Sequence, residues 1–80
     1  MPGAIPLNHI RNGCWALVTE LAAEGPARRR LLDLGLVPGT KVEVIRRSPL
    51  GDPIAFNIRG AVIAFRKEEA EQVLVLQVTQ

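Results

Sequence analysis

The sequence predicts a mainly β domain, a small barrel of about five strands with one or two short helices. Short segments that alternate polar and apolar residues recur along the 80-residue chain, and clusters of Gly, Pro, Asn and Asp separate them, as in small β-barrel proteins. One segment instead carries its apolar residues at helical spacing. The length allows a single small domain, which buries only about 60% of the surface that its unfolded chain exposes.

The N-terminal part of the chain predicts a lead-in followed by a first strand. Residues 1–13 contain two prolines, two glycines and two asparagines and end in the turn signal Asn12-Gly13, so we expect an irregular segment there. Residues 14–21 combine aromatic, β-branched and alternating residues, which is typical of a strand. The barrel domain is therefore expected over residues 14–80.

A short helix is predicted over residues 26–34. Pro26 suits the first helical position because its missing N–H has no partner there in any case. Leu31 and Leu34 lie on one face at helical spacing. Gly35 follows directly and can adopt the left-handed conformation that ends a helix without steric cost.

Four more strands are predicted in the second half of the chain. Residues 37–40, with the sequence Val-Pro-Gly-Thr, are typical of a β-turn. Alternating or apolar residues then predict strands at 41–46, 54–59, 61–65 and 73–78, with a helical turn at 66–72. Residues 48–53 are rich in turn formers and predict a loop. The segment 61–65 is apolar on both faces, which predicts a central strand, and a closed barrel would leave no strand edge exposed.

The composition argues against several classes of protein. Cys14 is the single cysteine, so no intrachain disulfide can form and a reducing, cytoplasmic compartment is expected. A membrane-spanning helix needs about 20 consecutive apolar residues, a run that the sequence lacks, and the N-terminus does not resemble a signal peptide. Ten basic residues against eight acidic ones do not require a nucleic-acid partner.

The sequence offers little for catalysis or nucleotide binding. Residues 35–41 superficially resemble a phosphate-binding loop, but that motif runs from a strand through the loop into a helix, and here the expected order is helix, turn, strand. Cys14 and His9 form the one conceivable thiol–imidazole pair, and no third group is evident to orient the imidazole. We therefore predict that the chain is not an enzyme.

His9 and Cys14 are also the weak candidates for metal ligands. A closed zinc site usually takes four ligands, and the alternative interpretation is a surface histidine and a buried cysteine acting as a small apolar residue. No cofactor is expected to be required. A divalent ion such as Fe²⁺ or Zn²⁺ bound at this pair would be adventitious or regulatory.

The main charge cluster is Arg28-Arg29-Arg30 on the predicted helix. It can be a solvated helix face, with Asp33 pairing with Arg29 or Arg30 at helical spacing. It can also contact RNA, although binding of single strands usually needs stacking aromatic residues as well, or it can dock a protein partner. The residues expected at a partner surface combine these arginines with apolar and loop residues: Arg28, Arg29, Leu32, Leu36, Leu50 and Asp52.

An ordered set of motifs resembles the FeoA family. It consists of residues 29–39 (RRLLDLGLVPG), 42–44 (VEV), 48–53 (SPLGDP), Arg59-Gly60 and 63–66 (IAFR). The resemblance implies an SH3-like barrel and a small cytoplasmic protein of bacterial ferrous-iron uptake. It also implies that the protein binds or regulates the cytoplasmic G-protein region of the FeoB membrane transporter, and thereby reaches the membrane only indirectly.

Two alternatives to this function stay open at the level of sequence. One is a small-barrel module that binds nucleic acid, suggested by the sequence pI of about 9.3. The other is a metal-responsive regulator, because the same fold resembles the C-terminal domain of iron-dependent repressors. A sharper form of the leading hypothesis has one arginine acting on the nucleotide of the partner, as arginine fingers do, but the sequence does not select which one.

Overall fold

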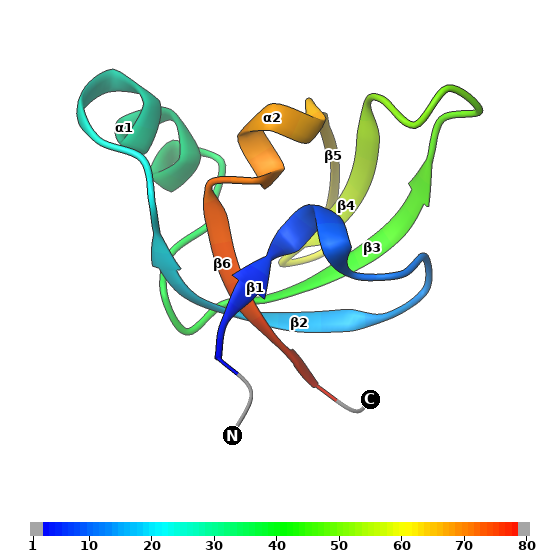
Figure 1. Cartoon of the computed structure of the whole chain (residues 1–80), viewed down its shortest axis with the longest axis horizontal. Helices are drawn as coiled ribbons and strands as arrows, with labels where there is room; N and C mark the ends of the chain where they lie inside the picture. The colour runs from blue at the N-terminus through cyan, green and yellow to red at the C-terminus, as the bar shows by residue number, and fades with distance from the viewer. Residues whose placement is uncertain (1–2, 79–80) are drawn as a thin grey trace.

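The computed structural model describes residues 3–78, so residues 1–2 and 79–80 of the predicted segments lie outside the described part. Six antiparallel strands form one curled sheet in the order β1-β6-β2-β3-β4-β5, and two short helices lie toward the top of the view in Figure 1. In chain order the elements are β1 (Ile5–Pro6), the 3-10 helix η1 (Leu7–His9), β2 (Trp15–Leu21), α1 (Gly25–Asp33), β3 (Lys41–Arg47), β4 (Ile54–Ile58), β5 (Ala61–Phe65), α2 (Lys67–Ala70) and β6 (Val73–Val78).

This architecture confirms the predicted mainly β fold with short helices, with six strands in place of about five. β1 and β5 end the strand order and do not pair with each other within residues 3–78, so the expectation that a closed barrel would leave no strand edge exposed is wrong. The predicted helix, the helical turn and the strands of residues 14–78 all occur, with their ends displaced by at most a few residues. No helix among residues 3–78 is long and apolar enough to cross a membrane.

The prediction of an irregular lead-in is wrong for residues 5–9. β1 pairs with β6, with Ile5 opposite Val75, and η1 follows it directly. Leu7 and Ile10 are fully buried in the same hydrophobic core as the strands. The prolines and asparagines suggested a loop, but a proline is compatible with a sheet edge because its missing N–H can face away from the neighbouring strand.

The prediction that residues 61–65 form a central strand is also wrong. Within residues 3–78, β5 pairs with β4 alone and forms one end of the sheet. Ile63 and Phe65 point toward the core, whereas Val62 on the other face is 69% exposed. The strand is apolar on both faces even though one of them is open to solvent, and this combination misled the sequence-based interpretation.

The core lies on the concave side of the sheet. Its centre is a stacked pair of aromatic rings, Phe56 on β4 and Phe65 on β5, whose centroids are 4.3 Å apart. The same core includes buried residues on β2, β3 and β6, together with Leu31 of α1 and Ala70 of α2. Burial of each large apolar side chain contributes roughly 1.5–3 kcal/mol, so the core is the main source of stability.

The C-terminus of α1 ends as predicted. Gly35 has φ +99°; its N–H bonds to the Leu32 carbonyl at 2.9 Å, and the N–H of Leu36 bonds to the Leu31 carbonyl at 3.1 Å. This pair of bonds is the Schellman arrangement that closes many helices. It turns the chain so that Leu36 enters the core, and the 37–40 turn follows, closed by a 3.0 Å bond from the N–H of Thr40 to the Val37 carbonyl.

Candidate interaction surface

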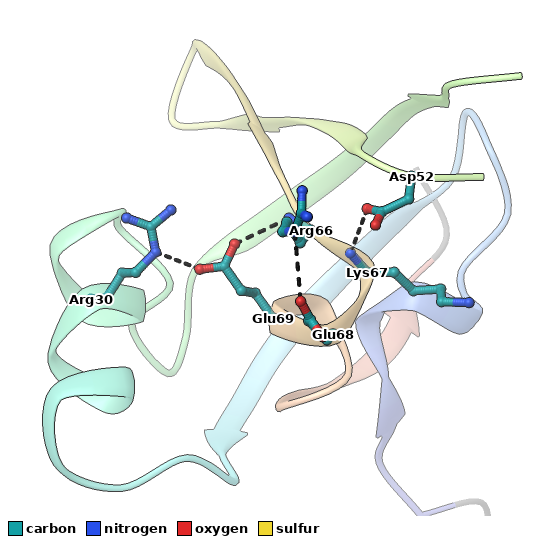
Figure 2. A network of polar contacts seen from close by, with 6 residues as sticks. All are labelled: Arg30, Asp52, Arg66, Lys67, Glu68 and Glu69. Atoms are coloured by element: carbon teal, nitrogen blue, oxygen red, sulfur yellow. Dashed lines mark hydrogen bonds and ion pairs between the residues drawn. The ribbon is translucent and has the colours of Figure 1, made fainter. Parts of the chain in front are cut away.

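A network of polar contacts joins α1, α2 and the 48–53 loop (Figure 2). At its centre, one carboxylate oxygen of Glu69 accepts a hydrogen bond from the Arg30 guanidinium. The other accepts the backbone N–H of Arg66 at 3.1 Å, at the start of α2. The hydrogen bond from Arg30 lowers the pKa of Glu69 below its ordinary value, so the carboxylate stays ionised and holds the two helices together.

Asp52 extends this network to the loop. Its carboxylate accepts the backbone N–H of Lys67, the first residue of α2, at 2.9 Å, as the right side of Figure 2 shows. Its backbone carbonyl accepts a 2.6 Å hydrogen bond from the Ser48 hydroxyl. Asp52, expected as a partner-contact residue, therefore fixes the loop against α2 in the free protein.

The predicted surface residues of α1 separate into exposed and buried sets. Arg28 and Arg29 are exposed, and neither forms an ion pair within residues 3–78. Leu32 is half-buried and packs against the core. Leu36 is fully buried, so its expected place on a contact surface is corrected: the turn after Gly35 directs it into the core.

The ion pair between Asp33 and Arg29 or Arg30 that helical spacing allows does not form among residues 3–78, where Arg30 pairs with Glu69 instead. The helical spacing of these residues permits the local pair, but the fold brings α2 beside α1. The partner of Arg30 is the carboxylate of Glu69, which also accepts the backbone N–H of Arg66 at the start of α2. Sequence spacing alone cannot reveal this contact because 39 positions separate the two residues.

Leu50 is the most exposed large apolar side chain of the described residues, at 94%. It lies at the tip of the loop that joins β3 to β4. Beside this loop is a groove of about 530 Å³, which is lined by residues of three adjacent strands and the loop itself: Arg46, Arg47, Ser48, Pro49, Pro53, Ala55 and Ala64. Arginine is enriched at protein interfaces, so the groove with Arg46 and Arg47, together with the exposed Leu50 of the same loop, is the candidate contact surface.

The two weak metal candidates do not form a recognisable site. His9 is exposed on η1, and Cys14 is half-buried against the core. No group of three or more His, Cys, Asp or Glu residues suited to hold a metal ion occurs in residues 3–78. The pair alone falls short of the four ligands of a closed zinc site.

The aromatic residues do not form a stacking platform for nucleic-acid bases. Phe56 and Phe65 are buried and stack on each other, as the strand alternation predicted. Trp15 on β2 is half-buried. A surface that binds single strands usually presents several exposed aromatic side chains, and none of the three aromatic residues within residues 3–78 is exposed.

Two structural contacts escaped the sequence analysis. Arg47 at the end of β3 donates hydrogen bonds to the carbonyls of Asn8 and Ile10, at 2.5 and 2.9 Å, and to the Asn12 side chain at 2.9 Å. No local pattern signals this role, because the partners lie more than thirty positions away. The capping role of Glu69 could have been predicted from the sequence. Glu69 lies three residues after Arg66, which is the spacing of a carboxylate that caps the start of a helix.

Comparison with known proteins identifies the family. The family model described as the FeoA domain matches residues 5–77. The chain belongs to the FeoA family. Its members are non-enzymatic accessory proteins of ferrous-iron transport.

Solved structures of other members share the fold. The FeoA protein of Chlorobium tepidum is 45% identical, with a TM-score of 0.86 over 94% of this chain and 71% of its own. The FeoA-like protein of Clostridium acetobutylicum is 34% identical, with a TM-score of 0.91 over 100% of this chain and 93% of its own. A manganese-dependent transcriptional repressor, 20% identical with a TM-score of 0.85, shares the fold alone over 43% of its length.

One relative joins this domain to a transporter. The Fe(2+) transport protein A/Fe(2+) transporter FeoB fusion protein of Porphyromonas gingivalis is 29% identical over 69 residues. The match covers 86% of this chain but spans only 8% of that relative's length. In that protein the FeoA-like segment and the FeoB transporter are parts of one polypeptide.

Proposed function

We propose that this protein is an accessory protein of bacterial ferrous-iron uptake that works in the cytoplasm by binding the G-protein region of a FeoB-type transporter. The observation that carries the proposal is the fusion of a FeoA-like segment to FeoB in Porphyromonas gingivalis. Linkage in one chain keeps two domains at a high effective concentration, so a modest affinity between them is enough for association. When the two proteins are separate chains, a contact surface must supply the affinity that keeps them associated.

The described surface supplies suitable groups for such a contact. Leu50, 94% exposed, can insert as an apolar anchor, while Arg28 and Arg29 on α1 offer guanidinium groups that form forked hydrogen bonds and tolerate desolvation. Asp52 would act indirectly, because it holds the loop against α2. The proposal needs no cofactor and no nucleic acid, and the membrane is reached only through the transporter.

Isothermal titration calorimetry of the protein against the purified cytoplasmic G-protein region of the FeoB transporter from the same organism tests this proposal. We expect saturable binding that Leu50→Ser weakens, because the variant removes the exposed anchor without touching the core. Val37→Ser is the matched control: Val37 is also an exposed apolar side chain, at 39%, but lies in a different turn. The absence of any saturable binding by the unchanged protein contradicts the proposed function.

A further inference from the structure

The two edges of the sheet are protected very differently. β1 is only two residues long and contains Pro6, and short strands with proline are poor templates for pairing with another chain. β5 is five residues long and contains neither proline nor a charged residue. No further strand of residues 3–78 pairs with its outer side, so this edge lacks the usual devices that prevent edge-to-edge association.

The hairpin register determines which backbone groups of β5 are available. Arg59 and Gly60 form a two-residue turn with positive φ at both positions, 54° and 87°, which places Ile58 and Ala61 in a hydrogen-bonded pair. Such pairs alternate along an antiparallel ladder. The N–H and C=O groups of Ile63 therefore face β4, whereas those of Val62 face outward at the open edge.

The same alternation applies to Ala64, whose backbone groups also face outward. The side chains of Val62 and Ala64 are exposed, so nothing bulky hinders a strand that would lie beside them. Ala64 also lines the 530 Å³ groove together with Ala55 and Arg46. A side chain of an added strand next to Ala64 would therefore reach an apolar floor with a guanidinium at its rim.

Basic residues flank β5 at both ends, and Glu68, which follows them, pairs with Arg66 at 3.6 Å. Arg59 precedes the strand, and Arg66 and Lys67 follow it. Arg59 and Arg66 are exposed. An extended segment that pairs along the whole of β5 therefore meets positive charge at each end and apolar side chains in the middle. An apolar segment with acidic residues at both ends is complementary to this surface.

We propose that the open edge of β5 binds an extended segment of the FeoB cytoplasmic region, apolar at its centre and acidic at its ends, which adds to the sheet as a further strand. Main-chain hydrogen bonds to Val62 and Ala64 provide affinity in this mode, and the groove beside Ala64 provides specificity. This inference rests on the proposed function and names the part of the surface that carries it.

A second copy of the chain is a poorer occupant of this edge. In the antiparallel register that uses the outward groups of both copies, Val62 of one lies opposite Ala64 of the other. Arg59 of each copy then lies near Arg66 and Lys67 of the other, at both ends of the paired strands. Like charges opposite each other destabilise strand pairs, so the charge pattern favours an acidic partner over self-association.

Amide hydrogen exchange, measured by NMR on the free protein and on the protein saturated with the FeoB G-protein region, tests the proposal directly. In the free protein the amides of Val62 and Ala64 should exchange rapidly, while those of Ile63 and Phe65, bonded to β4, are protected. Binding should slow exchange at Val62 and Ala64 by about tenfold or more, because each gains a hydrogen bond. Ile63 and Phe65 serve as internal controls.

Substitutions give an independent readout by calorimetry. Val62→Pro removes an outward N–H without breaking a bond to β4 and should weaken binding by about tenfold or more, whereas Val62→Ala keeps the N–H and should have a smaller effect. Arg46→Gln should also weaken binding, and Arg11→Gln, an equal charge change at an exposed residue outside the groove lining, should not. Unchanged NMR spectra away from β5 verify that each variant folds.

The possible outcomes separate the two proposals. If the unchanged protein does not bind the G-protein region, the proposed function fails and this inference fails with it. If it binds but exchange at Val62 and Ala64 stays as fast as in the free protein, only the edge-strand inference is overturned. Protection of these amides that rises with protein concentration in the absence of FeoB would identify a second copy as the occupant and would likewise overturn it.

Discussion

The two ends of the sheet are attached to the same core by different means. The β1–η1 end is held by two buried side chains, Leu7 and Ile10, and by the Arg47 guanidinium, which bonds the carbonyls beyond the strand. The β5 end is held by the stacking of Phe65 on Phe56. Arg47 occupies the Asn8 and Ile10 carbonyls at the first end. At the second end, no hydrogen bond within residues 3–78 occupies the outward backbone groups of Val62 and Ala64, so the proposed added strand would break none there.

Of the substitutions that test this comparison, Phe65→Ala should lower the stability most. It removes one of the two stacked rings, and the Phe65 side chain is only 2% exposed. We expect a loss of about 3–5 kcal/mol in the free energy of unfolding, a large part of the roughly 5–15 kcal/mol typical of folded proteins. Urea denaturation followed by circular dichroism measures it. Val62→Ala on the same strand, at a 69% exposed position, should stay within about 0.5 kcal/mol.

Leu7→Ala tests the opposite end of the sheet. Leu7 is fully buried, so we expect a loss of about 2–5 kcal/mol in the free energy of unfolding. Hydrogen exchange in the variant should show faster opening of β1 and its neighbour β6, with β5 less affected. A loss within about 0.5 kcal/mol, the range of surface substitutions, would show that the N-terminal segment is not part of the core.

Arg47→Gln removes the polar anchor of the same end. Three hydrogen bonds to residues 8–12 are lost, two of them to carbonyls in part-buried positions, so we expect a loss of about 1–3 kcal/mol in the free energy of unfolding. Arg46→Gln is the control, because Arg46 is exposed on the adjacent position of β3. Equal urea midpoints for the two variants would contradict the anchoring role of Arg47.

Glu69→Gln should have the smallest effect, and the effect should depend on pH. The hydrogen bond with Arg30 lowers the pKa of Glu69 in the folded state. The ionised carboxylate therefore contributes its full stabilisation when the pH is above 4.5, the ordinary pKa of a glutamate. This stabilisation is lost as the pH falls through the lowered pKa of the folded state. The variant should therefore differ most from the unchanged protein at neutral pH and converge with it in acid. Glu71→Gln is the control: Glu71 is exposed and forms no ion pair within residues 3–78, so its replacement should change the free energy of unfolding by no more than about 0.5 kcal/mol at neutral pH.

Much of the fold could be predicted from local signals. Gly35 after Leu31 and Leu34 marked the end of α1, and the Val-Pro-Gly-Thr sequence marked the turn that precedes β3. These features depend on backbone conformation, which a few neighbouring residues determine. The ordered motifs also indicated the FeoA family from the sequence alone, and the family match over residues 5–77 confirms it.

The errors concern contacts between distant segments. β1 is too short to carry a strand pattern of its own and exists because β6 lies beside it. The position of β5 at an edge depends on the pairing of the whole sheet, which its apolar sequence does not encode. The candidate surface likewise divides into local and long-range features. The exposure of Leu50 could be predicted from its position in a loop. The burial of Leu36 and the Arg30–Glu69 contact depend on how distant segments pack and could not be predicted.

The most direct test of this account is a titration of the ¹⁵N-labelled protein with the purified cytoplasmic G-protein region of a FeoB-type transporter, the proposed partner, followed by two-dimensional NMR. We predict saturable changes in the signals of Val62, Ala64 and the 48–53 loop with Leu50, and little change in β1 and η1. The absence of any change at saturating concentration, or changes confined to the β1–η1 end, would contradict the proposed binding of FeoB through this surface.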